Sequence, residues 1–537
     1  MSSDLSLPHS NELLLRLEEL TEVGISLSRQ RDIPRLLEAI LGAAKRITNA
    51  DGGTLYRVDS ERRLALFEIL HTDSLGISVG GATGAEVPFY PVQLYDESGA
   101  PNNSMVVAYS VLHDQTVNLA DAYQADGFDF SGTREFDQKT GYRSKSFLTV
   151  PMKNHEGEII GVLQLINAKD GETGAIVAFS EADQKLAEAL ASQAAVALTN
   201  GQLIDQLEQL FESFINLINA AIDDKSPYTA GHCQRVPALT MMLAEAVNET
   251  KEGPLADFSM TNKDHYELRI AGLLHDCGKI TTPVHVVDKA TKLQTIYDRI
   301  GVINTRFEVI RRDAEVRMLK QKLAAPDNCN GEWQQAEREF EATCRQMELD
   351  RVFLRFANIG SERMARQDQD RVYEISQAYR WRDSAADEEV DFLTEDELRN
   401  LTIRSGTLTQ EERQIINRHI DVTIRMLESL PWPSHLRNVP EYAGGHHERM
   451  DGKGYPRGLT GDQMSVQARV MAIADIFEAL TARDRPYKMA NTLSESLDVL
   501  RRFKDNGHID PDLFDVFVKQ KVYEKYAQRF LDPEQID

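Results

Sequence analysis

Apolar residues recur at helical spacing early in the chain and at strand-like spacing after it. Residues 11–23 and 31–48 each place leucines or isoleucines on one face, which predicts two amphipathic helices. Five apolar runs then predict strands. These runs cover residues 53–58, 65–70, 105–109, 146–151 and 158–166. With a further helix opening at Ser180, the pattern indicates an α+β domain with an antiparallel sheet.

A long helical pattern without proline runs from Glu181 to Ala221, weakened only by Gly201. Its apolar positions alternate at spacings of four and three, which is typical of a coiled-coil seam. The seam positions are Val196, Asn200, Leu203, Leu207, Leu210, Phe214, Leu217 and Ala221. An asparagine in such a seam favours two parallel strands in fixed register, so we expect a parallel homodimer. The part from Phe214 onward can equally be the first core helix of the next domain.

The remainder of the chain is nearly all helical in pattern, and one segment within it stands apart. Between Thr291 and Gly406, two apolar stripes separated by a turn at residues 326–331 predict a long helical hairpin. The rest of this segment is highly charged and carries no recognisable catalytic motif. We therefore predict that this segment takes no part in catalysis.

Composition narrows the class of protein. At roughly 150 residues per domain, 537 residues make about three or four domains' worth of chain. A net charge of −25 argues against a nucleic-acid polymer as partner. An anionic substrate would need a local positive charge to offset this background, and bound metal is the obvious candidate. The four cysteines are unclustered, so no disulfide framework is expected. We see no signal peptide and no apolar run long enough for a membrane span, and expect a soluble cytoplasmic protein.

Several histidines and aspartates stand at unusual places. His275 and Asp276 end an apolar helix, where both can reach one ion and the carboxylate can bridge two. His446 and His447 open a glycine-rich run that ends at Pro456, and glycines let a loop approach a ligand closely. Three further candidates lie on predicted helices, where each alone is more often structural. They are His232, His419 and Asp475.

These residues resemble the HD-GYP family, a branch of the HD-superfamily metal-dependent phosphohydrolases. The run His-Asp-Cys-Gly-Lys at 275–279 matches the first signature, and His-His-Glu-x-x-Asp-Gly-x-Gly-Tyr-Pro at 446–456 matches the second. The flanking frames Tyr-Thr-Ala-Gly-His-x-x-Arg-Val and Ala-Asp-Ile-Phe-Glu-Ala-Leu-Thr-Ala also match. The resemblance covers about 215–290 and 407–500, so the segment between is an insertion relative to the family.

The resemblance implies an all-α catalytic domain and a centre of two divalent metals, with iron or manganese expected. Carried over by position, the implied ligands are His232, His275, Asp276, His419, His446, His447 and Asp475. Asp276 would bridge the two ions. His232, His275 and Asp475 would complete one site and the other histidines the second, although the division stays open. Members with three metals have a Glu where this chain has Tyr228, which puts a third metal in doubt.

Two ions close together can clamp the oxygens of an anionic phosphodiester and activate water at neutral pH. In this scheme Asp276 and Lys279 are the catalytic residues, with Lys279 neutralising phosphate charge or assisting the leaving group. The expected substrate contacts are Arg485, Lys488, Gly454 and Tyr455. For Lys279, Arg485 and Lys488, an ordinary surface or salt-bridge role is an equal alternative.

The N-terminal part resembles a GAF domain, over roughly 12–200. The resemblance rests on Asp121-Ala122-Tyr123, Thr140-Gly141-Tyr142-Arg143, Val150-Pro151-Met152 and the run 161–167. It is closest to the cyclic-nucleotide phosphodiesterase type, which carries an Asn-Lys…Phe…Asp-Glu motif. Asn167, Lys169, Phe179 and Asp183 are similar to it, with the Lys offset by one and Gln184 in place of Glu. A small ligand such as a cyclic nucleotide is implied, and a GAF used only for dimerisation is the alternative.

The expected organisation is a GAF sensor at 1–180, a coiled-coil linker at 181–222 and an HD-GYP domain at 223–537 with the insertion at about 291–406. The resemblance implies a phosphodiesterase that hydrolyses a bacterial cyclic dinucleotide, with cyclic di-GMP ahead of mixed GMP–AMP cycles. Two alternatives remain. One is an HD-type nucleotide phosphohydrolase, and the other is a binding protein that has lost catalysis.

Overall fold

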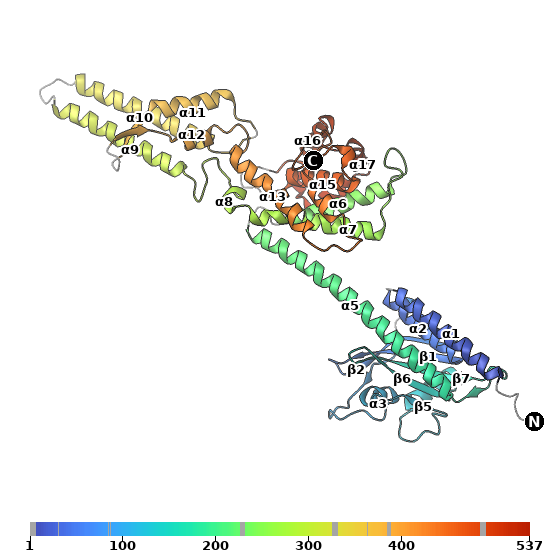
Figure 1. Cartoon of the computed structure of the whole chain (residues 1–537). Coiled ribbons are helices and arrows are strands. Elements are labelled where there is room, and N and C mark those ends of the chain that lie inside the picture. The colour runs from blue at the N-terminus through green and yellow to red at the C-terminus, as the bar shows by residue number, and fades with distance from the viewer. Residues whose placement is uncertain are drawn as a thin grey trace, which may run out of the picture. The chain divides into compact units, whose positions relative to one another are not determined.

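The computed structural model describes residues 7–537 apart from 31, 84, 86, 226–230, 325–330, 362, 384–387 and 484–489. The chain divides into two compact units, Met1–Phe211 and Glu212–Asp537. Figure 1 shows that a sheet with helices builds the first unit and that helices dominate the second. This agrees with the predicted α+β domain followed by a helical domain.

A single antiparallel sheet with helices on both faces forms the first unit. Its strands are β1 (Ala50–Asp59), β2 (Leu64–Thr72), β3 (Ile77–Gly80), β4 (Val92–Gln93), β5 (Val117–Leu119), β6 (Phe147–Lys153), β7 (Ile159–Lys169) and β8 (Ile176–Val177). The order is β3-β2-β1-β7-β6-β5, with β4 on β2 and β8 on β7. The helices are α1 (Leu7–Arg29), α2 (Ile33–Ile47), α3 (Val106–His113), α4 (Ser131–Thr140) and α5 (Glu181–Lys225), with a 3-10 turn η1 (Gly81–Thr83).

The main core of this unit lies between the sheet and the helices α1, α2 and α5 (Figure 1). Leu36, Ile40 and Leu41 from α2 meet Leu163 and other strand residues there, all without appreciable exposure. The predicted start of α5 is confirmed, because Ser180 and Asp183 hydrogen-bond to each other's backbone and side chain at 2.9 and 3.1 Å. These contacts satisfy amide groups that the first helical turn leaves open.

The predicted strand at residues 105–109 is wrong, since α3 occupies this segment. A continuous apolar run cannot be assigned to helix or strand by periodicity alone. Here Val106 packs with Phe130 and Phe147, while Val107 packs in a separate cluster with Tyr56. Packing of both sides of the helix on the second face of the sheet outweighs the strand preference of β-branched valines.

Helices around one buried centre make up most of the second unit. They are α6 (His232–Glu249), α7 (Asn262–Leu274), α8 (Val284–Val287), α13 (Gln410–Glu428), α14 (Val439–Gly444), α15 (Val466–Thr481), α16 (Leu493–Asp505), α17 (Pro511–Lys519) and α18 (Val522–Phe530). The 3-10 turns η2 (Cys277–Thr281) and η3 (Gly461–Gln463) lie between helices, and η4 (Pro533–Gln535) follows α18. A capping box of Thr409 and Glu412 begins α13.

Residues 291–406, the predicted insertion, form an arm with a core of their own. Its helices are α9 (Ile300–Ala324), α10 (Gly331–Ala357), α11 (Arg366–Ala378) and α12 (Glu395–Leu401). The predicted hairpin is therefore confirmed in its two helices, while most of its predicted turn lies outside the described residues. Phe307 on α9 meets Leu354 on α10 and Phe392 in a cluster that lies within the arm. The sequence patterns did not predict the short sheet of β9 (Arg380–Asp383) and β10 (Glu388–Asp391).

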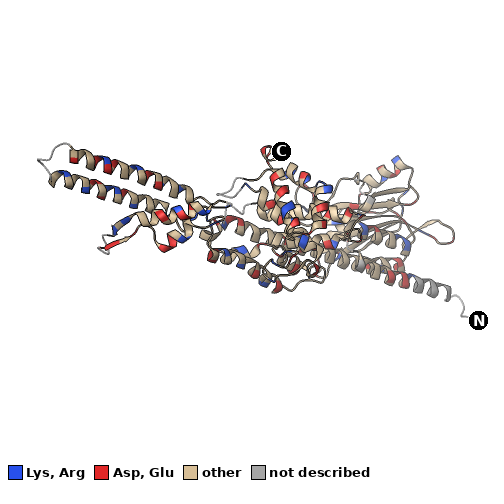
Figure 2. Ribbon diagram, turned by 90° about the horizontal axis from the view of Figure 1, so that it is seen from above, with Lys and Arg blue, Asp and Glu red and all other residues tan. Residues whose placement is uncertain are grey.

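Charge is spread over the arm in both signs, as Figure 2 shows along its two long helices. Several of these charges pair between the helices, for example Arg351 with Glu308 at 3.3 Å. None of the described helices is both long enough and apolar enough to cross a membrane.

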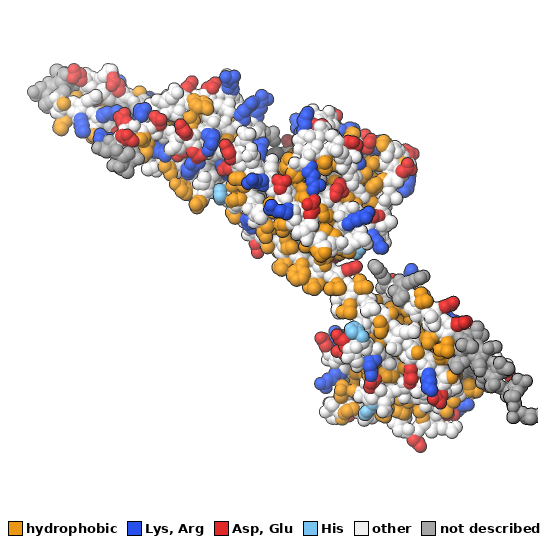
Figure 3. Space-filling model, viewed as in Figure 1, with side chains coloured by type: hydrophobic (Ala, Val, Ile, Leu, Met, Phe, Trp, Pro, Cys, Tyr) orange, Lys and Arg blue, Asp and Glu red, His pale blue; other side chains and the backbone are white. Residues whose placement is uncertain are grey.

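The predicted seam of α5 is open in the single chain. Leu203, Leu207 and Leu210 are 45%, 63% and 52% exposed, and Phe214 and Leu217 are exposed as well. Figure 3 shows hydrophobic side chains gathered along this helix. Five large apolar residues on one stripe are costly to leave in water, which favours a partner helix.

Candidate metal centre

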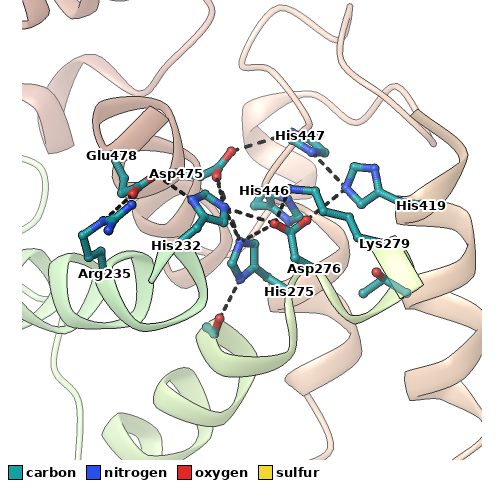
Figure 4. Close-up of polar contacts among 12 residues, drawn as sticks. His232, Arg235, His275, Asp276, Lys279, His419, His446, His447, Asp475 and Glu478 are labelled. Atoms are coloured by element: carbon teal, nitrogen blue, oxygen red, sulfur yellow. Dashed lines mark hydrogen bonds and ion pairs between the residues drawn. The ribbon is translucent and has the colours of Figure 1, made fainter. Parts of the chain in front are cut away.

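Five segments of the second unit bring together all seven residues that the resemblance implies as metal ligands (Figure 4). His232 opens α6, His275 ends α7, and Asp276 precedes η2. The other four are His419 on α13, His446 and His447 just after α14, and Asp475 on α15. Six of the seven, all but His447, have side chains no more than 13% exposed.

Gly278 explains why η2 can lie so close to α13. A Cβ built on Gly278 would lie 2.0 Å from the His419 carbonyl oxygen and 2.7 Å from the Thr423 amide nitrogen. Only glycine allows this approach. The Gly278 amide also donates to Thr423 Oγ1 at 3.0 Å. The contact holds Asp276 beside His419.

The seven side chains form two groups of possible ligands. The ligand atoms of His232, His275 and Asp276 all lie within 4.8 Å of one another. His232 Nε2 is 3.1 Å from Asp276 Oδ2 and 3.4 Å from His275 Nε2. Asp475 joins this group, with Oδ1 3.4 Å from His232 Nε2. Four imidazole and carboxylate donors at such spacing suit a divalent transition metal.

The second group consists of His419, His446 and His447, whose ligand atoms also lie within 4.8 Å of one another. His419 Nε2 and His447 Nε2 are 3.3 Å apart. Asp276 reaches this group through its other oxygen, because Oδ1 lies 3.2 Å from His419 Nε2. One carboxylate thus faces both groups, with Oδ2 toward the first and Oδ1 toward the second.

Hydrogen bonds at Nδ1 orient three of the histidines so that their Nε2 lone pairs face the centre. His275, His419 and His446 each place Nδ1 2.6 Å from a main-chain carbonyl, those of Gly272, Ile416 and Ala443. A carbonyl only accepts, so each Nδ1 carries the proton and each Nε2 has a free lone pair.

Two buried atoms of the centre lack a hydrogen-bond partner among the described residues. They are Asp276 Oδ1 and His446 Nε2. Buried acceptors are normally satisfied, and lone pairs 3.2–3.4 Å apart repel each other unless a cation lies between them. The donor set, its tautomers and these two atoms therefore fit bound metal ions.

The electrostatics of the two groups differ. Burial disfavours a charged His232, but Glu478, Asp276 and Asp475 outweigh it and raise its pKa well above the usual value. Burial also opposes ionisation of Asp276, yet Lys279 and the histidines hold its pKa well below the usual value. In the second group, burial lowers the pKa of His446 strongly and that of His447 to about 4. The first group is therefore rich in negative charge, and His446 and His447 are neutral donors.

Lys279 lies at the edge of the centre, with Nζ 2.5 Å from Asp276 Oδ2 and a side chain 24% exposed. Burial tends to lower the pKa of Lys279, but Asp276 and Asp475 raise it, so this ammonium stays charged.

The loop after His447 folds tightly over the second group. Tyr455 stacks on the His447 ring, with centroids 4.8 Å apart. Gly454 has no room for a side chain, since a Cβ would lie 2.4 Å from Glu448 Cα. Buried Glu448 accepts the amides of Arg457 and Leu459 at 2.7 and 2.9 Å. The loop is thus held by Glu448, and Tyr455 borders the centre at His447.

Three residues named from the resemblance, Tyr228, Arg485 and Lys488, lie outside the described residues. The structure adds two that the sequence reasoning did not single out. Glu478 Oε2 lies 2.5 Å from His232 Nδ1, and Glu478 Oε1 lies 2.7 Å from Arg235 Nε. Both could have been noted from spacing, because Glu478 is three residues after Asp475 and Arg235 three after His232 on their helices.

The first unit contains a second candidate site, a cavity of about 470 Å³. Aromatic side chains form much of its wall, including Phe67, Phe136 and Phe147, with Gln164 and Tyr142 among its polar lining. This volume and lining suit a small organic ligand.

The residues similar to the Asn-Lys…Phe…Asp-Glu motif are arranged around this unit's core. Lys169 pairs with buried Asp51, which also accepts the Tyr142 hydroxyl at 2.6 Å. Asp183 instead accepts from Arg16 of α1 at 2.9 Å. Lys169 therefore pairs with Asp51, and Asp183 pairs with Arg16. Tyr142, which contacts Asp51, also lines the cavity.

Comparison with known proteins places different domain families in the two units. Residues 32–198 match the GAF domain model, and residues 229–346 and 395–513 match HD domain models. The chain therefore carries a GAF domain followed by an HD domain, consistent with an HD-GYP protein with an N-terminal GAF domain.

Three curated relatives are similar to parts of the chain. The 3'3'-cGAMP-specific phosphodiesterase 1 of Vibrio cholerae is 39% identical over 22% of this chain and 28% of its own length. The cyclic di-GMP phosphodiesterase PA4108 of Pseudomonas aeruginosa is 41% identical over 22% and 27%. The dual 3',5'-cyclic-AMP and -GMP phosphodiesterase 11A of Takifugu rubripes is 38% identical over 20% and 11%. The chain thus spans under a third of the length of each.

Proposed function

We propose that this protein is a metal-dependent phosphodiesterase that hydrolyses a bacterial cyclic dinucleotide, with cyclic di-GMP the first candidate substrate. Linear pGpG, and after further cleavage GMP, would be the products. The names of the Vibrio and Pseudomonas relatives support this substrate class. The proposed metals are two ions of iron or manganese.

The observation that carries the proposal is the position of Asp276 between two groups of donors. Its two oxygens lie 3.1 Å from His232 Nε2 and 3.2 Å from His419 Nε2. A carboxylate shared between two donor sets suits two-metal hydrolysis, because it can hold two ions close together. When bound, such ions polarise a phosphodiester and lower the pKa of water.

The chain's own residues would orient and neutralise the substrate. Lys279 is charged and half-buried beside Asp276, so it can bind a phosphate oxygen by a charge-assisted hydrogen bond. Tyr455 presents a ring beside His447, where a base or ribose can pack. Glu448 holds the surrounding loop in place by accepting a hydrogen bond from the Arg457 amide. Arg485 and Lys488 are proposed as further phosphate contacts.

We also propose that a small ligand in the GAF cavity regulates hydrolysis through a parallel homodimer. The cavity has room for a compound of nucleotide size, and cyclic nucleotides are the first to test. The exposed stripe on α5 supports pairing with a second copy.

The test is hydrolysis of a panel of cyclic dinucleotides, linear nucleotides and cyclic mononucleotides by protein loaded with Mn²⁺ or Fe²⁺, with products separated by chromatography. Linear dinucleotide from a cyclic dinucleotide supports the proposal. Asp276→Asn should abolish turnover. Asp350→Asn is a matched control, because Asp350 is equally buried but pairs with Arg371 and Tyr379 in the arm.

The same assay separates the alternatives. Turnover of nucleotides alone would indicate an HD-type nucleotide phosphohydrolase. Tight binding of a cyclic dinucleotide without turnover by metal-loaded protein would indicate a binding protein.

A further inference from the structure

We propose that Glu478 and Arg235 form a positioning pair that fixes His232 as a metal ligand and makes the His232 group the tighter of the two metal subsites. This inference rests on the proposed two-metal function. Neither residue is a catalytic residue, because each acts only through His232.

The pair joins two helices at the back of His232 (Figure 4). His232 and Arg235 lie one turn apart on α6, and Asp475 and Glu478 lie one turn apart on α15. Glu478 is 1% exposed and contacts His232 Nδ1 with one oxygen and Arg235 Nε with the other. A buried carboxylate is stable only when paired, and Arg235 supplies the balancing charge.

This contact determines which nitrogen of His232 faces the centre. Glu478 accepts a hydrogen bond from the Nδ1–H of His232, so Nε2 is the nitrogen that faces Asp276 and Asp475 and would supply a lone pair to a bound metal. A carboxylate behind the imidazole also makes the ring a stronger electron donor to a metal. Within the described chain, no other histidine of the centre has a carboxylate at hydrogen-bond distance from Nδ1. His275, His419 and His446 donate to main-chain carbonyls instead.

The two subsites therefore differ in charge. The His232 group has two carboxylates beside its imidazoles, Asp276 and Asp475, with Glu478 directly behind. The His419 group has three imidazoles and shares Asp276, while Asp475 approaches it less closely, with Oδ2 4.0 Å from His447 Nδ1. Because divalent cations bind more strongly where negative charge is concentrated, we infer that the first ion enters the His232 group.

The experiment is titration of metal-free protein with Co²⁺, followed by calorimetry and by the visible absorption of the bound ion. The wild type should take up two ions, one tighter than the other. Glu478→Gln keeps the size of the side chain but removes the charge, and should weaken the tighter site by roughly 10- to 100-fold. The weaker site should keep its affinity. In a His446→Gln background, which leaves one tight ion, adding Glu478→Gln should remove tight binding altogether.

Glu397→Gln is the matched control. Glu397 is also buried and pairs with an arginine, Arg306 at 2.6 Å, but it lies in the arm and is not among the residues of the centre. This variant should bind Co²⁺ as the wild type does. If Glu478→Gln does not fold, Glu478→Asp replaces it and should show a smaller loss at the same site. Unchanged Co²⁺ binding by the folded variant, or an equal loss in Glu397→Gln, would overturn the inference. A wild type that binds no Co²⁺ would instead contradict the proposed function.

Discussion

Gly278 and His419 are in backbone contact so close that a methyl group between them would lie 2.0 Å from the His419 carbonyl oxygen. This contact joins the turn that follows Asp276 to the helix that carries His419. The distance between the two donor groups therefore depends on a residue that donates no ligand.

Gly278→Ala should separate these segments. Overpacking against backbone atoms typically costs about 1–3 kcal/mol, and the displaced turn should move Asp276 from His419. We expect a lower urea midpoint and loss of about one metal ion per chain, measured by elemental analysis.

Gly301→Ala is the control for that change, because a Cβ on Gly301 meets nothing within 4 Å and the position is helical. It should leave metal content unchanged and stability equal or slightly higher. Full metal content in a folded Gly278→Ala protein would show that the close contact does not set the site.

The arm should be removable without loss of the metal centre. Its two ends meet, since Thr407 Oγ1 donates to the Lys289 carbonyl at 2.8 Å. Its apolar cluster also lies within the arm. Replacing residues 291–406 with a short Gly-Ser linker should leave the metal-to-protein ratio unchanged. A folded, dimeric deletion protein that has lost its metal would show that the arm supports the centre.

Lys292 should make the arm's stability depend on pH. It is 1% exposed, and its Nζ contacts Met364 Sδ and the Leu401 carbonyl at 3.2 and 3.0 Å. Burial lowers its pKa to about 8, against about 10.4 in an unfolded chain. The unfolded state binds more protons between these values, so stability should rise from pH 8 to about 10.4, by at most about 3 kcal/mol.

Lys292→Met should remove this pH dependence and stabilise the arm near neutral pH. Tryptophan fluorescence is the measurement, because Trp333 and Trp381 lie in the arm and one of the three tryptophans lies outside it. Lys289→Met is the contrasting control. Lys289 is equally buried but pairs with Glu412 at 2.8 Å, so its loss should destabilise. A Lys292→Met protein with the wild-type pH profile would contradict the assignment.

The seam on α5 should drive dimerisation. Leu203, Leu207 and Leu210 are exposed in the single chain, and their joint replacement by Asn should give monomers because buried seam leucines drive pairing. Any effect of a GAF ligand on hydrolysis, roughly 5- to 150-fold for a typical coupling, should disappear with it. Light scattering at micromolar concentration measures the mass, with the exposed polar residue Gln206 changed to Asn as control. A monomeric wild type would contradict this route of regulation.

The candidate centre could be predicted from sequence because its proposed ligands stand in long, ordered motifs, with His275 and Asp276 adjacent and His446 and His447 adjacent. The structure brings these motifs together with His232, His419 and Asp475, as the resemblance implied. Glu478 was not predicted, because its contact with His232 joins residues 246 positions apart, and its spacing of three from Asp475 was the one local signal that pointed to it.

Elements were harder to predict where tertiary packing decides the outcome. The apolar run at Val106–His113 is a helix because both of its sides pack on a sheet built from distant strands. The strands β9 and β10 are short and charged, so they lack the alternation that marks a strand. In contrast, α2 and α13 were predictable from clear apolar periodicity and, for α13, a capping box.

The most direct test of the central claim is oxygen-18 incorporation during hydrolysis of cyclic di-GMP. Metal-free protein, Mn²⁺-loaded protein and Mn²⁺-loaded Asp276→Asn would be compared in water enriched in oxygen-18. The product would be analysed by mass spectrometry. We predict linear pGpG carrying one labelled oxygen in its new phosphate monoester, formed only by the loaded wild type. Equal product from the metal-free protein, or no product from cyclic di-GMP or any other cyclic dinucleotide with the loaded wild type, would contradict the account.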